Sequence, residues 1–108
     1  MRSVRLLELA ATEAAEAAAW YETQRAGLGY EFREEFRVAL DLLRQEPIPG
    51  RQWPGRLGER GVMRVAMKRF PFFLVFLNVN SESVVLAVAH HRRRPAYWSK
   101  RTSDAKPG

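Results

Sequence analysis

Apolar residues recur every three or four positions in two stretches of the first half of the chain, which predicts two helices. Residues 12–25 are dominated by alanine, the best helix former, with Thr12 as the expected N-cap and Gly27 as the expected stop. Residues 30–45 carry the clearer apolar stripe. Its members are Phe32, Phe36, Ala39, Leu40 and Leu43. Because only a short Gly-Leu-Gly link separates the two stretches, we expect an antiparallel helical hairpin.

The second half of the chain changes to runs of β-branched, aromatic and leucine residues, which predict strands. Residues 62–67 form one candidate strand. Residues 72–79 and 83–89 are almost continuously apolar, as expected of buried strands. The turn residues at 78–82 join these two strands into a hairpin.

The predicted order of elements is β-α-α-β-β-β, with a first strand within residues 2–9 and a proline- and glycine-rich loop at residues 46–61. A helical hairpin on one face of a small, mainly antiparallel sheet is an α+β arrangement that buries both apolar surfaces. The length of 108 residues fits one domain, which we assign to residues 1–101. Residues 102–108 are polar and are expected to form a disordered tail.

Basic charge is concentrated in the C-terminal part of the chain. Residues 1–46 carry nine acidic and six basic residues, a net charge of −3, whereas residues 47–108 carry three acidic and twelve basic residues, a net charge of +9. Most of the basic residues are arginines, whose planar guanidinium groups pair well with phosphate. This segregation favours nucleic acid or another acidic partner over a surface that is basic only for solubility.

Several classes of protein and site are disfavoured by the composition. The chain has no apolar run of about 18 residues, so we expect no contact with a membrane core. It shows no secretory signal and has no cysteine, which favours a cytoplasmic location without disulfides. We expect no metal ion or other cofactor, because the two histidines are adjacent and no further ligands stand at a suitable spacing.

The segment of residues 90–101 is the strongest candidate for chemistry. It holds two histidines, four arginines, one lysine, one tyrosine and one tryptophan. Arginines bind phosphates, aromatic rings stack on unpaired bases, and histidine transfers protons near neutral pH. Only one of His90 and His91 can face such a site, since neighbouring residues on a strand point to opposite faces. The alternative is that Tyr97 and Trp98 pack on the sheet beneath solvated arginines, and we assign Trp98 to packing.

Three further runs of sequence stand out, one in the predicted helical hairpin, one in the predicted central strand and one at the C-terminal end. They are Trp20-Tyr21-Glu22 with Gly27-Leu28-Gly29 and Phe32, then Arg69-Phe70-Pro71-Phe72 with Val75 and Phe76, then Leu86-Ala87-Val88-Ala89-His90 with Arg92-Arg93 and Pro95-Ala96-Tyr97-Trp98. In this order and spacing the chain resembles the RelE/ParE-type toxins of type II toxin–antitoxin modules, from about residue 4 to residue 101. The resemblance implies two helices on one side of a small sheet, and an antitoxin partner that folds on binding.

The resemblance leaves three functions open. A toxin of the RelE branch cuts mRNA in the ribosomal A site by metal-independent attack of the ribose 2′-hydroxyl on the adjacent phosphate. A toxin of the ParE branch inhibits DNA gyrase and has no known nuclease chemistry. A detoxified member retains only antitoxin binding and repression of its operon. The expected partners are therefore a cognate antitoxin together with either the ribosome and mRNA or DNA gyrase.

The resemblance also implies roles for individual residues. The candidates for catalysis of RNA cleavage are Arg64, His90 (or His91), Arg92 and Tyr97. The candidates for nucleic-acid binding are Lys68, Arg69, Arg93, Arg94, Lys100 and Arg101, although Lys68 and Arg69 also fit a solvated surface.

One position departs from the RelE pattern. The arginine that RelE-type toxins carry on the third strand falls at Phe73 in this chain. Losing one phosphate-stabilising charge costs on the order of a hundredfold in rate. This departure counts against nuclease activity.

Overall fold

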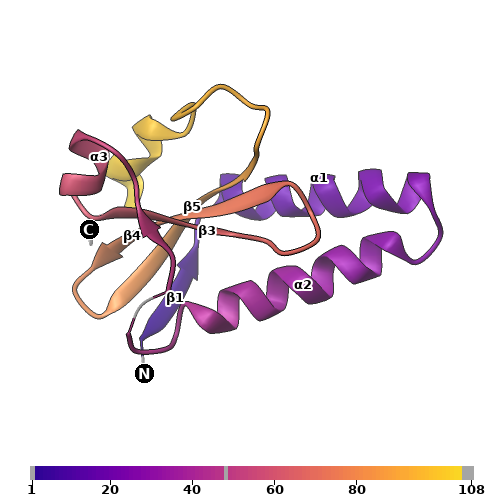
Figure 1. Ribbon diagram of the computed structural model, residues 1–108, viewed down its shortest axis with the longest axis horizontal. Helices are drawn as coiled ribbons and strands as arrows, with labels where there is room; N and C mark the ends of the chain where they lie inside the picture. The colour runs from indigo at the N-terminus through magenta and orange to yellow at the C-terminus, as the bar shows by residue number, and fades with distance from the viewer. Residues whose placement is uncertain (1, 48, 106–108) are drawn as a thin grey trace.

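The computed structural model describes residues 2–47 and 49–105 and shows an α+β fold built around one five-stranded sheet (Figure 1). The strands are β1 (Ser3–Leu6), β2 (Arg51–Gln52), β3 (Val62–Ala66), β4 (Phe72–Val79) and β5 (Glu82–His90). The helices are α1 (Glu8–Gln24), α2 (Leu28–Leu42), the short α3 (Arg56–Glu59) and the 3₁₀-helix η1 (Ser99–Ala105). Within the described residues, no helix combines the length and apolar character needed to cross a membrane.

The sheet has the strand order β1-β5-β4-β3-β2, in which only the β1–β5 pair is parallel. This confirms the predicted α+β class and the mainly antiparallel sheet. The hairpin of β4 and β5 lies at the centre, and β5 is buried from Ser83 to Ala89. Its continuous apolar run is explained by cover on both faces of the sheet.

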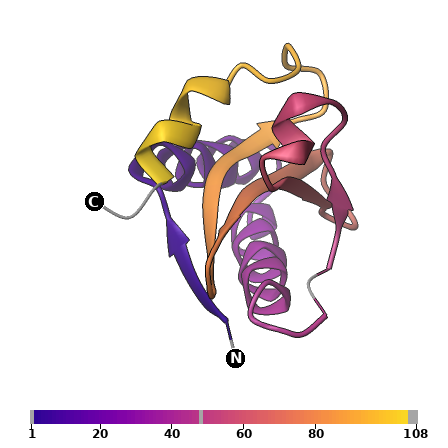
Figure 2. The same cartoon turned by 90° about the vertical axis from the view of Figure 1, so that its left-hand side faces the viewer.

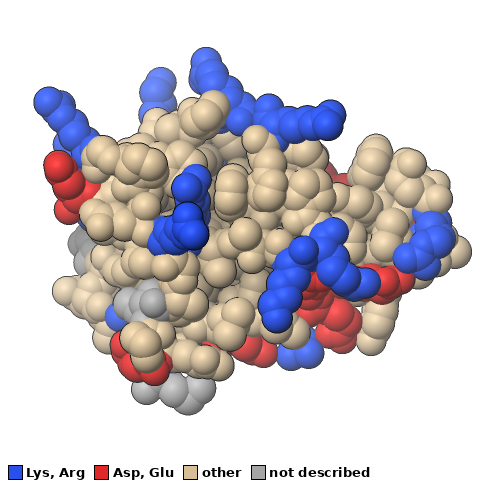
Figure 3. All heavy atoms as spheres, viewed as in Figure 1, with Lys and Arg blue, Asp and Glu red and all other residues tan. Residues whose placement is uncertain are grey.

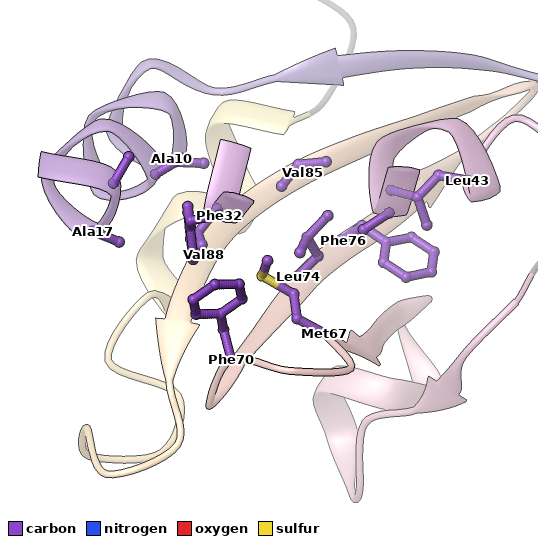
Figure 4. Close-up of a cluster of buried hydrophobic side chains, with 13 residues drawn as sticks. Ala10, Ala17, Phe32, Leu43, Met67, Phe70, Leu74, Phe76, Val85 and Val88 are labelled. Atoms are coloured by element: carbon purple, nitrogen blue, oxygen red, sulfur yellow. The ribbon is translucent and has the colours of Figure 1, made fainter. Parts of the chain in front are cut away.

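The two long helices form an antiparallel hairpin that packs on one face of the sheet (Figure 2). The core between helices and sheet is aromatic and aliphatic, and it joins α2 to the two central strands (Figure 4). Its largest members are Phe32, Leu43, Met67, Phe70, Leu74, Phe76, Val85 and Val88. The helices approach closely at Gly29, where a Cβ atom would lie only 2.6 Å from the carbonyl oxygen of Ala18.

The opposite face of the sheet is covered by α3 and η1, which enclose a second core. Trp98 is 1% exposed at its centre and packs edge-on against Trp53, with the ring centroids 4.8 Å apart. The assignment of Trp98 to packing is thus confirmed. Ala105 is also buried in this core, so the expected disordered tail is wrong for residues 102–105, while residues 106–108 lie outside the described residues.

The boundaries at the N-terminal end differ from the predicted ones. The helix α1 begins at Glu8 rather than after Thr12, and β1 has only four residues. Leu7 is the N-cap and makes no capping bond through its side chain. Its backbone N–H instead donates to the carbonyl of Val85 on β5, so a tertiary contact, with no capping residue to signal it, sets the change from strand to helix.

The predicted loop at residues 46–61 is wrong in part, because it contains β2 and α3. Both elements contact β3, with which β2 pairs directly, and between them the N–H of Trp53 donates to the carbonyl of Val62 at 2.9 Å. The second helix also starts earlier than predicted. Gly27, with φ of 89°, is its N-cap.

Candidate functional site

Two adjoining hollows lie on the sheet face that carries α3 and η1, and we call them together the basic cleft. Their volumes are about 390 and 410 Å³, and both are lined by Arg64 of β3 and Phe73 of β4. The first is completed by Gly50, Arg51, Val65 and Ala66, and the second by Trp53, Pro54, Ala89, His90, His91, Arg93, Arg94, Pro95, Tyr97 and Trp98. Neither hollow is lined by an acidic residue.

Arg64 lies at the junction of the two hollows. Its guanidinium carbon is 5.2 Å from the ring centroids of both Trp53 and Phe73, a distance that allows cation–π attraction to each ring. Arg64 is also the direct cross-strand neighbour of Arg51 on β2. Among the described residues, neither arginine has a carboxylate within 4.0 Å. Arg64 is therefore a half-buried, unpaired charge held in place by aromatic rings.

The two histidines at the end of β5 are turned to different neighbours. The ring of His91 lies over Phe73 in the cleft, with centroids 4.2 Å apart and the ring planes tilted by 38°. The ring of His90 lies edge-on to Phe72, which packs against the core on the helical side. His90 Nδ1 also accepts a hydrogen bond from the backbone N–H of Arg92 at 3.0 Å. His91 is thus the histidine whose ring contacts Phe73 in the cleft.

Tyr97 forms part of the cleft wall, but its hydroxyl group is bound on the far side by Glu13 of α1. The hydroxyl donates to Glu13 Oε2 at 2.7 Å. Arg101 Nη1 donates to Glu13 Oε1 at 3.0 Å, and so does the backbone N–H of Val88 at 3.0 Å. The guanidinium carbon of Arg93 lies 3.7 Å from the centroid of the Tyr97 ring, and Arg93 Nη1 lies 3.7 Å from Glu13 Oε2. We call these five residues the Glu13 anchor.

The Glu13 anchor changes the acid–base chemistry of Tyr97. Burial, followed by the hydrogen bond to Glu13 and its negative charge, raises the pKa of Tyr97 well above the usual range of a phenol. The hydroxyl therefore stays protonated at neutral pH and remains committed to Glu13. These contacts give Tyr97 a structural part, in which it fastens the C-terminal segment to α1.

The remaining sequence-predicted residues are distributed over several surfaces. Arg93 and Arg94 line the cleft, whereas Arg92 is exposed and does not. Arg101 belongs to the Glu13 anchor, and Lys100 is exposed on η1.

Lys68 and Arg69 lie beside α2, away from the cleft lining. Arg69 is paired with Glu35 at 3.1 Å and Glu31 at 3.1 Å, and these hydrogen bonds, that to Glu35 first, raise the pKa of its guanidinium. Lys68 is exposed next to this cluster. Lys68 and Arg69, which precede β4, are thus part of a charged surface shared with α2.

Three residues that shape the site were not predicted from the sequence. Arg51 and Trp53 lie in the stretch predicted as loop, where a tryptophan close to an arginine among prolines and glycines was the available signal. Glu13 looked like an ordinary acidic residue of the first helical turn. Its partner Tyr97 is 84 residues away, so no local pattern connects them.

The surface of the molecule separates the two kinds of charge. Figure 3 shows basic side chains along the upper rim, over the loop that follows β5, while most of the acidic side chains in this view lie along the helical side and at the left-hand end. The cleft side therefore presents positive charge with few acidic neighbours. This arrangement suits an anionic ligand.

The chain matches a family model described as the ParE toxin of type II toxin-antitoxin system, parDE, over residues 4–95. It is also similar to a solved structure described as the chromosomal ParDE TA system from P. aeruginosa, with a TM-score of 0.72 and 18% sequence identity. That match covers 83% of this chain and 96% of the other. At this identity the structural similarity shows a shared fold. No curated protein matches the chain.

Proposed function

The chain belongs to the family of ParE toxins of type II toxin–antitoxin systems, and from this premise we propose that it acts by binding and inhibiting DNA gyrase. As the toxin of such a system, it has a cognate antitoxin as its partner. The proposal concerns the cellular target, and its precedent is the gyrase inhibition by toxins of the ParE branch.

The observation that carries the proposal is the floor of the basic cleft. The ring of Phe73 on β4 lies against Arg64 and His91. By the resemblance described in the sequence analysis, this is the position where RelE-type toxins carry an arginine. The phenol in the cleft wall, Tyr97, is bound by Glu13 and holds its proton. A cleft with this composition is better suited to binding than to stabilising the charge that develops during phosphodiester cleavage.

Purified gyrase tests the proposal. We expect the full-length chain to inhibit supercoiling of relaxed plasmid and expect antitoxin added beforehand to prevent this inhibition. In a purified translation reaction the same concentration of chain should leave mRNA intact. Supercoiling that continues unchanged at a high excess of the chain would rule out gyrase as the target.

A second candidate function is ribosome-dependent mRNA cleavage, favoured by the presence of His91, Arg64 and Arg94 around one cleft. Under this alternative His91 would transfer the proton and the arginines would bind the phosphate. Cleaved mRNA in the translation reaction, lost in His91→Ala, would support it. Normal growth on expression without antitoxin would instead indicate a detoxified member of the family.

A further inference from the structure

Arg51 and Arg64 are like charges placed directly opposite each other in the sheet. They are cross-strand partners in the β2–β3 pair, where like charges destabilise the pairing. No carboxylate of the described residues lies within 4.0 Å of either guanidinium, and none lines the two hollows that meet at Arg64. An anion bound between the two arginines would remove the repulsion.

The backbone brings this pair together through a close approach at Gly50. A Cβ atom at Gly50 would lie 2.4 Å from the carbonyl oxygen of Arg64, and φ at Gly50 is +96°. Only glycine fits both conditions, so the chain before β2 can lie directly against β3. The two arginines are thus held as neighbours by the main chain.

Aromatic rings lie beside the arginine pair. Phe73 and His91 are in tilted contact with each other, and Trp53 also lies against the Arg64 guanidinium. Phe73 and Trp53 are half-buried and His91 is exposed, so parts of these rings border open space. Phosphate-binding arginines next to such rings provide the two contacts that an unpaired nucleotide needs, one for its phosphate and one for its base.

We propose that the basic cleft binds one strand of unpaired nucleic acid, with a phosphate between Arg51 and Arg64 and an adjacent base against Phe73 and His91. Hollows of about 390 and 410 Å³ are suited to single nucleotides. A duplex hides the faces of its bases and would use only the arginines. An acidic peptide would likewise gain little from the rings, since its carboxylates would pair with the arginines of the cleft and not with the ring faces.

This inference rests on the proposed function and extends it, because gyrase acts on DNA and an inhibitor that also binds a DNA strand would contact both the enzyme and its substrate. Direct binding to the isolated chain does not require gyrase, so the two proposals can fail separately. Inhibition of gyrase without strand binding would remove this inference alone. Strand binding without inhibition would remove the proposed target alone.

Fluorescence anisotropy of the full-length chain with labelled oligodeoxythymidylate, oligouridylate and a duplex of equal length provides the test. We expect tighter binding to the single strands than to the duplex, and the ratio between the two single strands identifies DNA or RNA as the source. Arg51→Gln and Arg64→Gln should each reduce the slope of log K against log salt by about 0.7. Phe73→Leu should weaken binding about fivefold or more with the slope unchanged.

Arg33→Gln is the matched control, because it removes an equal charge from an exposed position on α2. It should leave affinity and slope unchanged. Arg51 is exposed on a two-residue edge strand, so Arg51→Gln keeps the test valid even if Arg64→Gln weakens the fold. Equal losses in Arg33→Gln, equal affinity for the duplex, competition by polyglutamate as strong as by a single strand, or no binding at all would each overturn the inference.

Discussion

At the scale of single residues, the carboxylate of Glu13 pairs with the backbone of β5 beyond the end of β1. β1 pairs with β5 only as far as Val85, so beyond that point β5 has a neighbouring strand on the β4 side alone. Glu13 accepts from the N–H of Val88, and Arg101 donates to the carbonyl of Leu86 at 3.0 Å. Because buried backbone groups must be paired, this ion pair stabilises the sheet edge as well as the C-terminal segment.

We predict that Glu13→Gln lowers the free energy of unfolding by about 2–4 kcal/mol, because it leaves the guanidinium of Arg101 without its counter-ion. The side chains of Glu13 and Arg101 are only 12% and 15% exposed, which limits replacement by water. Urea denaturation measures the effect. Glu16→Gln, at an exposed position of the same helix, should cost under about 0.5 kcal/mol, and equal losses in the two variants would refute the role of the anchor.

The raised pKa of Tyr97 predicts a loss of stability in alkali. Below about pH 10, the ordinary pKa of tyrosine, both the folded and the unfolded chain keep the phenolic proton and the full contribution is present. Above about pH 10 the unfolded chain releases the phenolic proton before the folded chain does. The free energy of unfolding therefore falls as the pH rises towards the pKa of Tyr97 in the folded chain.

Tyr97→Phe has no such proton, so we predict a smaller decrease of its unfolding free energy above about pH 10 than in the wild type. Urea denaturation of both proteins over a pH series gives the comparison, and every other titrating group is common to the two. Parallel curves would show that the Tyr97 phenol titrates alike in the folded and unfolded chain.

At the scale of elements, the two glycines of the helical link differ in what a side chain would meet. Gly27 has φ of 89°, and no atom lies within 4 Å of the position that a Cβ atom would take there, whereas Gly29 lies against the backbone of α1. A methyl group at Gly27 costs only local backbone strain. At Gly29 it would push the two helices apart.

We predict that Gly27→Ala lowers stability by about 1–2 kcal/mol through strain alone. Gly29→Ala is expected to cost about 1–3 kcal/mol through overpacking, and only this variant should also increase hydrogen exchange along the α1–α2 contact. Hydrogen exchange by mass spectrometry separates the two effects. Unchanged hydrogen exchange in Gly29→Ala would contradict the expectation that a methyl group at Gly29 pushes the two helices apart.

The elements that the sequence predicted best are those with a strong local pattern. The strand at residues 72–79 was predicted with its observed bounds, because its apolar run is continuous and ends in turn residues. The first helix was placed too late, since alanine-rich sequence carries no sharp signal at its start. β2 and α3 were missed because a strand of two residues and a helix of four depend on tertiary contacts.

At the scale of the whole molecule, the sheet is covered on both faces, and the cover on the second face creates the cleft. The helical hairpin was predictable from periodicity. The packing of Trp98 against Trp53 was not, because these residues are far apart in the sequence. The same limitation applies to the site, where Arg64 was identified from its own strand but Arg51 required the β2–β3 register.

If the basic cleft is the surface through which this toxin acts, its arginines are needed for toxicity, and growth after expression without antitoxin tests this most directly. We predict that the wild type and Arg33→Gln both arrest growth. The double variant Arg51→Gln/Arg64→Gln should permit growth while it accumulates to the same level and still binds the antitoxin. Growth arrest by the double variant equal to that of the wild type would contradict the account.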